Sequence, residues 1–206
     1  MPVTMNREYR RIDVANLETR EDGDGDLIVE GYASTFNQPY VLGSTKDFEL
    51  REQIDPHAFD ETDMEDVIMQ YDHEGRVFAR KRNGTLAVDV DEHGLHIRAN
   101  LKGTTIGRQL YEEINGGYTD RMSFGFTVDA DKREQTEENG VIRVLRTITK
   151  IRKLYDVSAV SLPANDATEI SARNLSDGVL AQITEERRAA EERKRKIQII
   201  KTLLEV

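Results

Sequence analysis

Ser123 is the residue of this sequence whose type and setting best suit nucleophilic chemistry. It lies in TDRMSFGFTV (119–128), where apolar side chains at every second position predict an extended strand. A serine hydroxyl becomes a useful nucleophile only when a histidine takes its proton and an acid orients that histidine. The sharp elbow that presents such serines in α/β-hydrolases needs glycine two residues earlier, where this chain has Arg121. Any activating histidine and acid must therefore come from other strands.

His73 and Asp156 are the candidates for the base and the acid. His73 comes directly after the apolar run VIMQY (67–71), at a strand end that can hold a side chain in a fixed place. Asp156 lies in LYDVSAV among apolar neighbours, where an unpaired carboxylate would be costly and a neighbouring imidazole would satisfy it. Spacing alone leaves the alternative open that His73 is an exposed turn residue and Ser123 an ordinary strand serine.

Two further histidines, His93 and His96, lie in and just after the turn DEHG. Together with His73 they define an alternative chemistry, a metal hydrolase. Zinc sites need three or four well-placed ligands, and two histidines in a turn are usually surface residues. We therefore predict no metal site and no cofactor.

Extended segments with alternating apolar residues follow one another along most of the chain, and a few short stretches interrupt them. The predicted strands are LIVEGYAS (from 27), VIMQY (67–71), LAVDV (86–90), LHIRANL (95–101), TDRMSFGFTV (119–128), VIRVLRTITKI (141–151) and KLYDVSAVSL (153–162). The turn DEHG makes a hairpin of the third and fourth. Residues 104–117 change to a period of about four, which predicts one short amphipathic helix. The charged stretch DADKREQTEENG (129–140) predicts an exposed hairpin loop.

The chain divides into three predicted parts. Residues 1–25 are polar and end in the Gly/Asp turn EDGDGD, residues 26–175 form the folded domain, and residues 176–206 form a charged C-terminal helix or tail. The folded domain is α+β and mainly β. The tail carries apolar residues at both ends, among them Val179 and Ile183, then Ile197 and Ile200. It is either an exposed helix or a docking element.

The bulk composition excludes several classes of function. The 206 residues include no cysteine, which rules out disulfides and thiolate chemistry. The net charge of −10 argues against general binding to nucleic acid, which needs cations to replace counterions. With 33% charged residues and no apolar run of membrane-spanning length, the sequence indicates a soluble protein without a membrane partner.

Five blocks of this sequence, in their order along the chain, resemble successive blocks of the prohead (capsid maturation) serine proteases of HK97-type tailed bacteriophages. The resemblance covers roughly residues 27–174, through the blocks GYASTFN, REQIDPHAFD, YDHEGRVFARKRNGTLAVDVDEHGLHIRANL, INGGYTDRMSFGF and LYDVSAVSLPANDATEI. It implies an assemblin-like β-barrel with surrounding helices, as in the herpesvirus proteases. It also implies a catalytic triad of His73, Ser123 and Asp156, although many relatives carry Glu at the third place. Assemblins use a second histidine there, for which His57 is a possible substitute.

The resemblance further implies a serine endopeptidase that works inside the assembling procapsid in the host cytoplasm. Its substrates would be the scaffolding segment of the major capsid protein and the protease itself, with a possible homo-oligomer. The loop SLPAN (161–165) is a candidate for the oxyanion hole, by analogy with assemblins. The alternative function is a non-catalytic capsid assembly scaffold or chaperone on the same fold.

Overall fold

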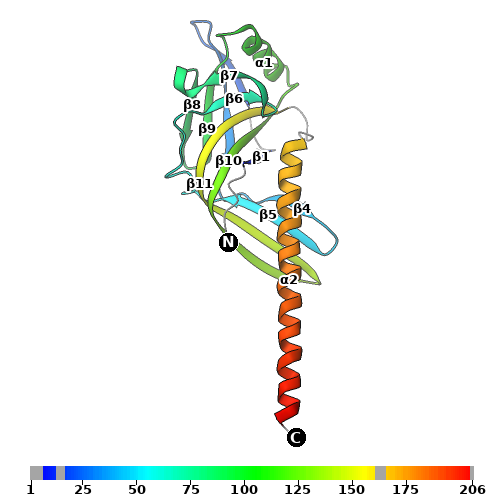
Figure 1. Ribbon diagram of the computed structural model, residues 1–206. Helices are drawn as coiled ribbons and strands as arrows, with labels where there is room; N and C mark the ends of the chain where they lie inside the picture. Colours follow the sequence, from blue (N-terminus) through cyan, green and yellow to red (C-terminus); the bar gives the residue numbers. More distant parts are fainter. Residues whose placement is uncertain (1–6, 13–16, 161–165, 205–206) are drawn as a thin grey trace.

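Two β-sheets and two helices make up the part of the chain that the computed structural model describes, residues 7–12, 17–160 and 166–204 (Figure 1). The larger sheet has the order β1-β10-β11-β5-β4, and β6 pairs with both β11 and β7; the smaller has the order β2-β3-β9-β8. The strands of the larger sheet are β1 (Glu8–Ile12), β4 (Tyr40–Ser44), β5 (Phe48–Ile54), β6 (Ile68–Tyr71), β7 (Glu74–Arg80), β10 (Arg121–Glu138) and β11 (Val141–Val160). Those of the smaller are β2 (Glu18–Glu21), β3 (Leu27–Thr35), β8 (Leu86–Val90) and β9 (Gly94–Asn100).

The main hydrophobic core contains apolar residues from both sheets. Phe124 and Phe126 of β10 stack there with ring centroids 4.5 Å apart, and Val29 and Ile97 of the smaller sheet belong to the same cluster. The prediction of a mainly β, α+β fold is therefore confirmed. The strand pairings of the described residues form no closed ring, so the barrel that the resemblance implies stays a prediction.

Local sequence signals located several elements correctly. The predicted hairpin is β8 paired with β9, and the predicted strand 67–71 is β6. The predicted short helix is α1 (Thr105–Asn115), which begins where the Thr104 side chain accepts a 3.0 Å hydrogen bond from the amide of Gly107. A 3-10 turn, η1 (Lys81–Asn83), follows β7.

The charged stretch 129–140 is not the exposed loop that its composition predicts. Strand β10 continues through it to Glu138, and only Asn139 and Gly140, with φ of 54° and 79°, form the turn. Two residues with positive φ suit the right-handed twist of a tight hairpin. The two strands predicted at 141–151 and 153–162 are likewise one strand, β11. β11 is itself held by β5, and its backbone hydrogen bonds to β10 keep the charged half of β10 extended. This half of β10 therefore forms a strand although it has no apolar face.

Strand β11 lies at the centre of the larger sheet. Along its length it is antiparallel to β10, while β5 pairs in parallel with residues 142–148 and β6 pairs in parallel with residues 156–159. Two strands that follow one another in the sequence, β5 and β6, are therefore aligned end to end along one side of β11. β6 consequently begins opposite Asp156, where Ile68 lies, and ends opposite Ala159, where Tyr71 lies.

Two strands, β1 and β2, lie in the described part of the first 25 residues, and their polar composition did not reveal them. β1 pairs with β10, and β2 pairs with β3. In β1 the side chain of Arg10 is only 1% exposed, which is rare for an arginine outside an ion pair. β1 is thus part of the folded body.

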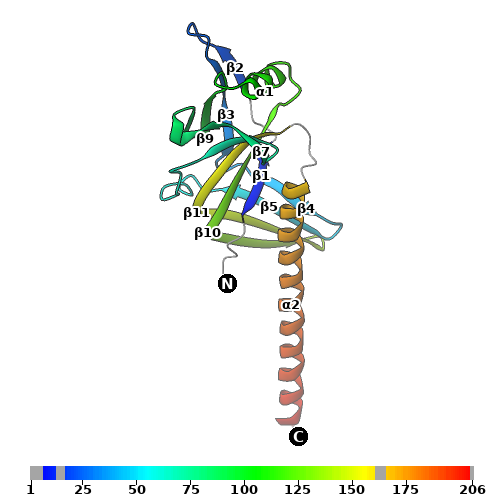
Figure 2. The same ribbon diagram turned by 45° about the horizontal axis from the view of Figure 1, so that its top comes forward.

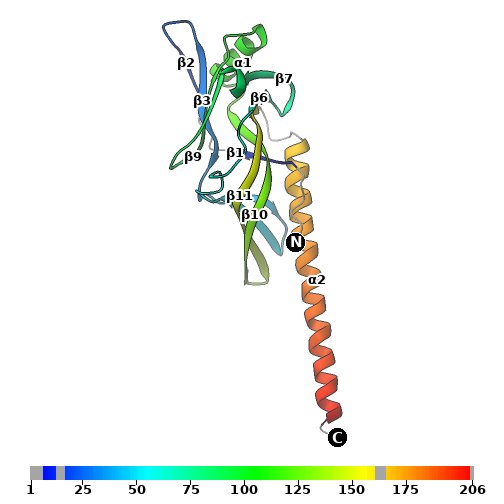
Figure 3. The same ribbon diagram turned by 60° about the vertical axis from the view of Figure 1, so that its left-hand side comes forward.

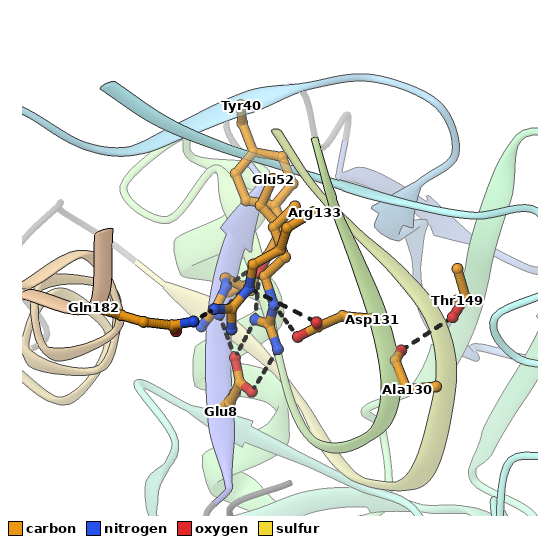
Figure 4. Close-up of polar contacts among 10 residues, drawn as sticks. Glu8, Tyr40, Glu52, Ala130, Asp131, Arg133, Thr149 and Gln182 are labelled. Carbon is orange, nitrogen blue, oxygen red and sulfur yellow. Dashed lines mark hydrogen bonds and ion pairs between the residues drawn. The ribbon is translucent and has the colours of Figure 1, made fainter. Parts of the chain in front are cut away.

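A buried cluster of charged side chains holds β1 against β5. Arg10 donates to both carboxylate oxygens of Glu52, at 2.5 and 3.2 Å, and Tyr40 donates to the same carboxylate at 2.7 Å. Arg146 donates to Glu52 at 2.6 Å and to Glu8 at 2.8 Å. Figure 4 shows the network of ion pairs and hydrogen bonds around Glu8 and Asp131, beside Glu52 and Tyr40.

The cluster keeps its members charged. Burial opposes the ionisation of Glu52, but Arg10 and Arg146 outweigh it and lower the pKa of the carboxyl below its ordinary 4.5. Burial likewise opposes the charge on Arg10, but the attraction of Glu52 and Glu8 raises the pKa of its guanidinium. Burial and the charge of Glu52 raise the pKa of Tyr40, which stays a hydrogen-bond donor.

Helix α2 (Asp166–Leu204) begins before the predicted start at Ser176. Its side chains Val179 and Ile183 pack in a second apolar cluster with Phe48 and Val144 of the larger sheet. Beyond Ile183 the helix extends away from the sheets, as Figures 1 and 3 show from two directions. No helix in the described ranges carries an apolar stretch long enough to cross a membrane.

We expect Glu52→Gln to destabilise the protein by about 3–5 kcal/mol at pH 7, because two buried guanidinium groups lose their shared carboxylate. The folded-state pKa of Glu52 is lowered, so its contribution is complete above about pH 4.5 and is lost as the pH falls through the folded pKa. The difference between wild type and variant in urea unfolding should therefore shrink below that pH. Glu49→Gln, on the same strand but paired with the half-exposed Arg51, is the matched control.

Deleting residues 184–206 should leave the free energy of unfolding almost unchanged, since residues 184–200 are exposed and the ion pair of Arg187 with Glu137 there is itself half-exposed. Deleting residues 176–206 should cost at least about 3 kcal/mol, because Val179 and Ile183 then leave the second apolar cluster. Urea unfolding followed by circular dichroism measures both. Equal losses for the two truncations would contradict this division of the helix.

Candidate active site

The structure brings the three predicted site residues, His73, Ser123 and Asp156, into one hydrogen-bonded chain. Nε2 of His73 lies 2.5 Å from Oγ of Ser123, and Nδ1 of the same ring bonds to Oδ2 of Asp156. Asp156 thus reaches the imidazole, although its side chain is shorter than the glutamate that many relatives carry at this place. All three side chains are buried: Ser123 and Asp156 are 0% exposed and the side chain of His73 is 2% exposed.

Sheet register explains why these residues meet. In the β10–β11 pair, Ser123 lies opposite Ser158 and Gly125 lies opposite Asp156. Side chains two residues apart on a strand lie on the same face, so Ser123 and Asp156 share one face of the sheet. β6 runs parallel to β11 beside residues 156–159, which places the turn after β6 over that face.

His73 lies in the two-residue turn between β6 and β7, where Tyr71 pairs with Glu74. Asp72 and His73 both have positive φ, 49° and 61°, a region that residues other than glycine enter at a cost of about 1–3 kcal/mol. The turn is fixed to β11 by hydrogen bonds from the Asp72 amide to the Ala159 carbonyl, 3.1 Å, and from the His73 amide to Ser158 Oγ, 3.2 Å. These contacts hold the imidazole in place.

Ser158 is a site residue that the sequence analysis missed. Its hydroxyl lies 3.2 Å from Nδ1 of His73 and 3.3 Å from Oδ2 of Asp156. It therefore touches the base, the acid and the backbone of the turn. Its position two residues after Asp156, on the same face of a predicted strand, was the available signal.

The second oxygen of Asp156 has a distinct environment. Oδ1 has no hydrogen-bond partner among the described residues, and Nη1 of Arg7 lies 3.5 Å from it. It fills the space that a side chain at Gly125 would take, since a Cβ there would lie 2.4 Å from it. The sheet can hold this carboxylate because residue 125 has no side chain.

The arrangement has the order that proton transfer from the serine requires. Nε2 faces the hydroxyl and Nδ1 faces the carboxylate, so one side of the ring can take a proton while the other is oriented by the acid. The predicted oxyanion loop, residues 161–165, lies outside the described residues.

The other histidines lie apart from this chain of contacts. His57 is exposed and its Nδ1 lies 3.1 Å from Asp60, so it does not take the place of Asp156. His93 lies in the turn between β8 and β9 and His96 in β9, both in the smaller sheet, packed beside Tyr32. Within the described ranges, no group of three or more histidine, aspartate or glutamate side chains is arranged to hold a metal ion.

Residues 15–181 match the family described as caudovirus prohead serine protease. The chain belongs to this family. It is also 29% identical over 167 residues to the prohead protease of Enterobacteria phage HK97. The match covers 79% of this chain and 67% of the phage HK97 protein. The capsid assembly protease of bacteriophage T4 is a structural neighbour at 12% identity and a TM-score of 0.44, covering 77% of this chain and 99% of that structure. Membership of the prohead protease family identifies the chain as a protease of phage capsid maturation.

In this prohead protease we expect Gly125→Ala to lower the rate of peptide cleavage by about 10²-fold. The added Cβ would overlap Oδ1 of Asp156 and press on the Tyr9 ring, at 2.4 and 3.0 Å, and displacements of about 1 Å have effects of that size. We also expect a loss of about 1–3 kcal/mol in the free energy of unfolding. Gly103→Ala is the control, because a Cβ there meets nothing within 4 Å.

Proposed function

We propose that His73, Ser123 and Asp156 are the catalytic triad of a serine endopeptidase. The single observation that carries the proposal is the continuous contact from hydroxyl to imidazole to carboxylate across three separate segments of the chain. Burial supports it as well, because a carboxylate that is 0% exposed is retained only where it has a partner.

The mechanism starts with transfer of the Ser123 proton to Nε2 of His73 as the oxygen attacks a peptide carbonyl carbon. Asp156 holds the ring in the required tautomer and stabilises the imidazolium that forms. His73 then gives the proton to the leaving amine, and an acyl-enzyme remains on Ser123. Water, activated by the same imidazole, releases the acid and restores the hydroxyl. Ser158 acts as a positioning residue, because its contacts are to His73 and Asp156.

The proposed substrate is the scaffolding segment of the major capsid protein, cut inside the procapsid in the host cytoplasm, together with the protease itself. The support is the family's name and the name of its relative, the prohead protease of Enterobacteria phage HK97. A non-catalytic assembly scaffold remains the second candidate. The part of α2 beyond Ile183 favours it, because Ile197, Ile199 and Ile200 there are 47–60% exposed and available to a partner.

Co-expression with the capsid protein distinguishes the two functions. Ser123→Ala should lower cleavage of the scaffolding segment by about 10⁶-fold, the loss that follows removal of a triad nucleophile. On a gel the capsid protein then keeps its full size, while wild type shortens it. Ser34→Ala is the control, since Ser34 is equally buried and no described residue makes a hydrogen bond to its hydroxyl. Unprocessed capsid protein with wild type and both variants would favour the scaffold.

A further inference from the structure

Strand β1 occupies the edge of β10 that carries Ser123. The two strands are antiparallel, with Tyr9 opposite Gly125, Arg10 opposite Phe124 and Arg11 opposite Ser123, and Figure 2 shows β1 lying along β10. Peptides often bind to proteins in this way, as an extra strand on an exposed sheet edge. Without β1, residues 122–126 would present such an edge beside the triad.

The position of β1 on the edge of β10 places the carbonyl group of Arg10 against the proposed nucleophile, Ser123. Oγ of Ser123 lies 2.9 Å from the carbonyl oxygen of Arg10, to which it donates. A carbonyl bond is about 1.2 Å long, so the Arg10 carbonyl carbon lies no more than about 4.1 Å from Oγ. Attack begins at about 3–3.5 Å, so a small shift of β1 suffices. A serine hydroxyl has one hydrogen, so donating it to Arg10 also withholds it from His73.

β1 also closes the site to any other peptide. The ring of Tyr9 lies over that of His73, with centroids 4.5 Å apart, and Arg7 lies beside Asp156. Ser123 is 0% exposed beneath this cover. The first peptide that can react is therefore β1 itself, and a second peptide can enter only after β1 has left.

The side chain of Arg10 fills a pocket whose chemistry is specific. Glu52 binds the guanidinium through both oxygens, and the ring of Phe126 lies 5.7 Å from it. Arg146, itself bonded to Glu52 and Asp131, completes the wall. The groups that the pocket keeps once β1 leaves are two carboxylates and one guanidinium, an excess of negative charge. A forked guanidinium matches this pair of oxygens better than the point charge of lysine.

We infer, building on the proposed function, that the edge of β10 is the substrate channel, that its pocket selects arginine as the residue before the cut bond, and that the chain first cuts itself between Arg10 and Arg11. In that step Oγ of Ser123 bonds to the Arg10 carbonyl carbon and the bond to the Arg11 nitrogen breaks. His73 passes the serine proton to that nitrogen. Water then releases residues 1–10 with a free carboxylate on Arg10, and the channel is open.

The first test follows the full-length chain by intact mass and N-terminal sequencing. We expect wild type to lose residues 1–10 and to gain a new terminus at Arg11, and Ser123→Ala to keep its original terminus. A cut at this bond that persists in Ser123→Ala would come from another protease and would overturn the inference. A chain that keeps its terminus while it processes the capsid protein would also overturn it, and would leave the proposed function standing.

The second test varies the substrate and leaves the enzyme intact. The self-processed protein is given the peptide NREYR, residues 6–10, joined to a reporter amine, and the same peptide with Arg10→Gln or Arg10→Lys. We expect kcat/KM to fall about 10²-fold or more with glutamine, because Glu52 is then left unpaired, and less with lysine. Equal rates for the three peptides would overturn the pocket assignment. Absence of cleavage of any peptide or of the capsid protein would instead refute the proposed function.

Discussion

Burial of the Asp156 carboxylate is the constraint on which the rest of the site depends. A charged group that is 0% exposed needs polar partners, and the fold supplies them to Oδ2 from the turn after β6 and from Ser158 of β11. The turn after β6 brings His73 to one oxygen, and the absence of a side chain at Gly125 leaves space for the other. The register of β10 against β11 then sets Ser123 beyond the imidazole. Local strain in the His73 turn is tolerated because these contacts determine its position.

A second buried group of charges, on the other side of β1, has the opposite character. Arg10 and Glu52 each have more than one partner of opposite charge. The pKa of Arg10 is therefore raised and the pKa of Glu52 is lowered. Alternate side chains of one short strand thus face two different sites: Tyr9 covers the triad, and Arg10 enters the charged cluster. The same five residues, Glu8–Ile12, connect the chemistry of the site with the stability of the larger sheet.

Elements that depend on neighbours in sequence were predictable, and those that depend on distant partners were not. Period and turn residues located the β8–β9 hairpin and helix α1, because both signals are local. The extended form of residues 129–138 comes from pairing with β11, which charge composition cannot reveal. The contact between His73 and Asp156 depends on the parallel pairing of β6 with β11, which no local pattern predicts. The residue types made these two residues candidates, and only the family resemblance assigned them to one site. β1 was missed because three of its five residues, Glu8, Arg10 and Arg11, are charged. Burial of Arg10 depends on its ion pair with Glu52, which is distant in the sequence.

The attachment of β1 to the chain whose serine it covers has a kinetic consequence. Both reacting groups belong to one molecule, so opening of the channel is a first-order event whose half-time is the same in dilute solution and at high local density. Cleavage of separate peptides, by contrast, is bimolecular and becomes faster where molecules are confined together. A covering strand on the same polypeptide therefore delays the cleavage of other peptides by a fixed time. The local concentration of those peptides when the channel opens then sets how fast they are cleaved.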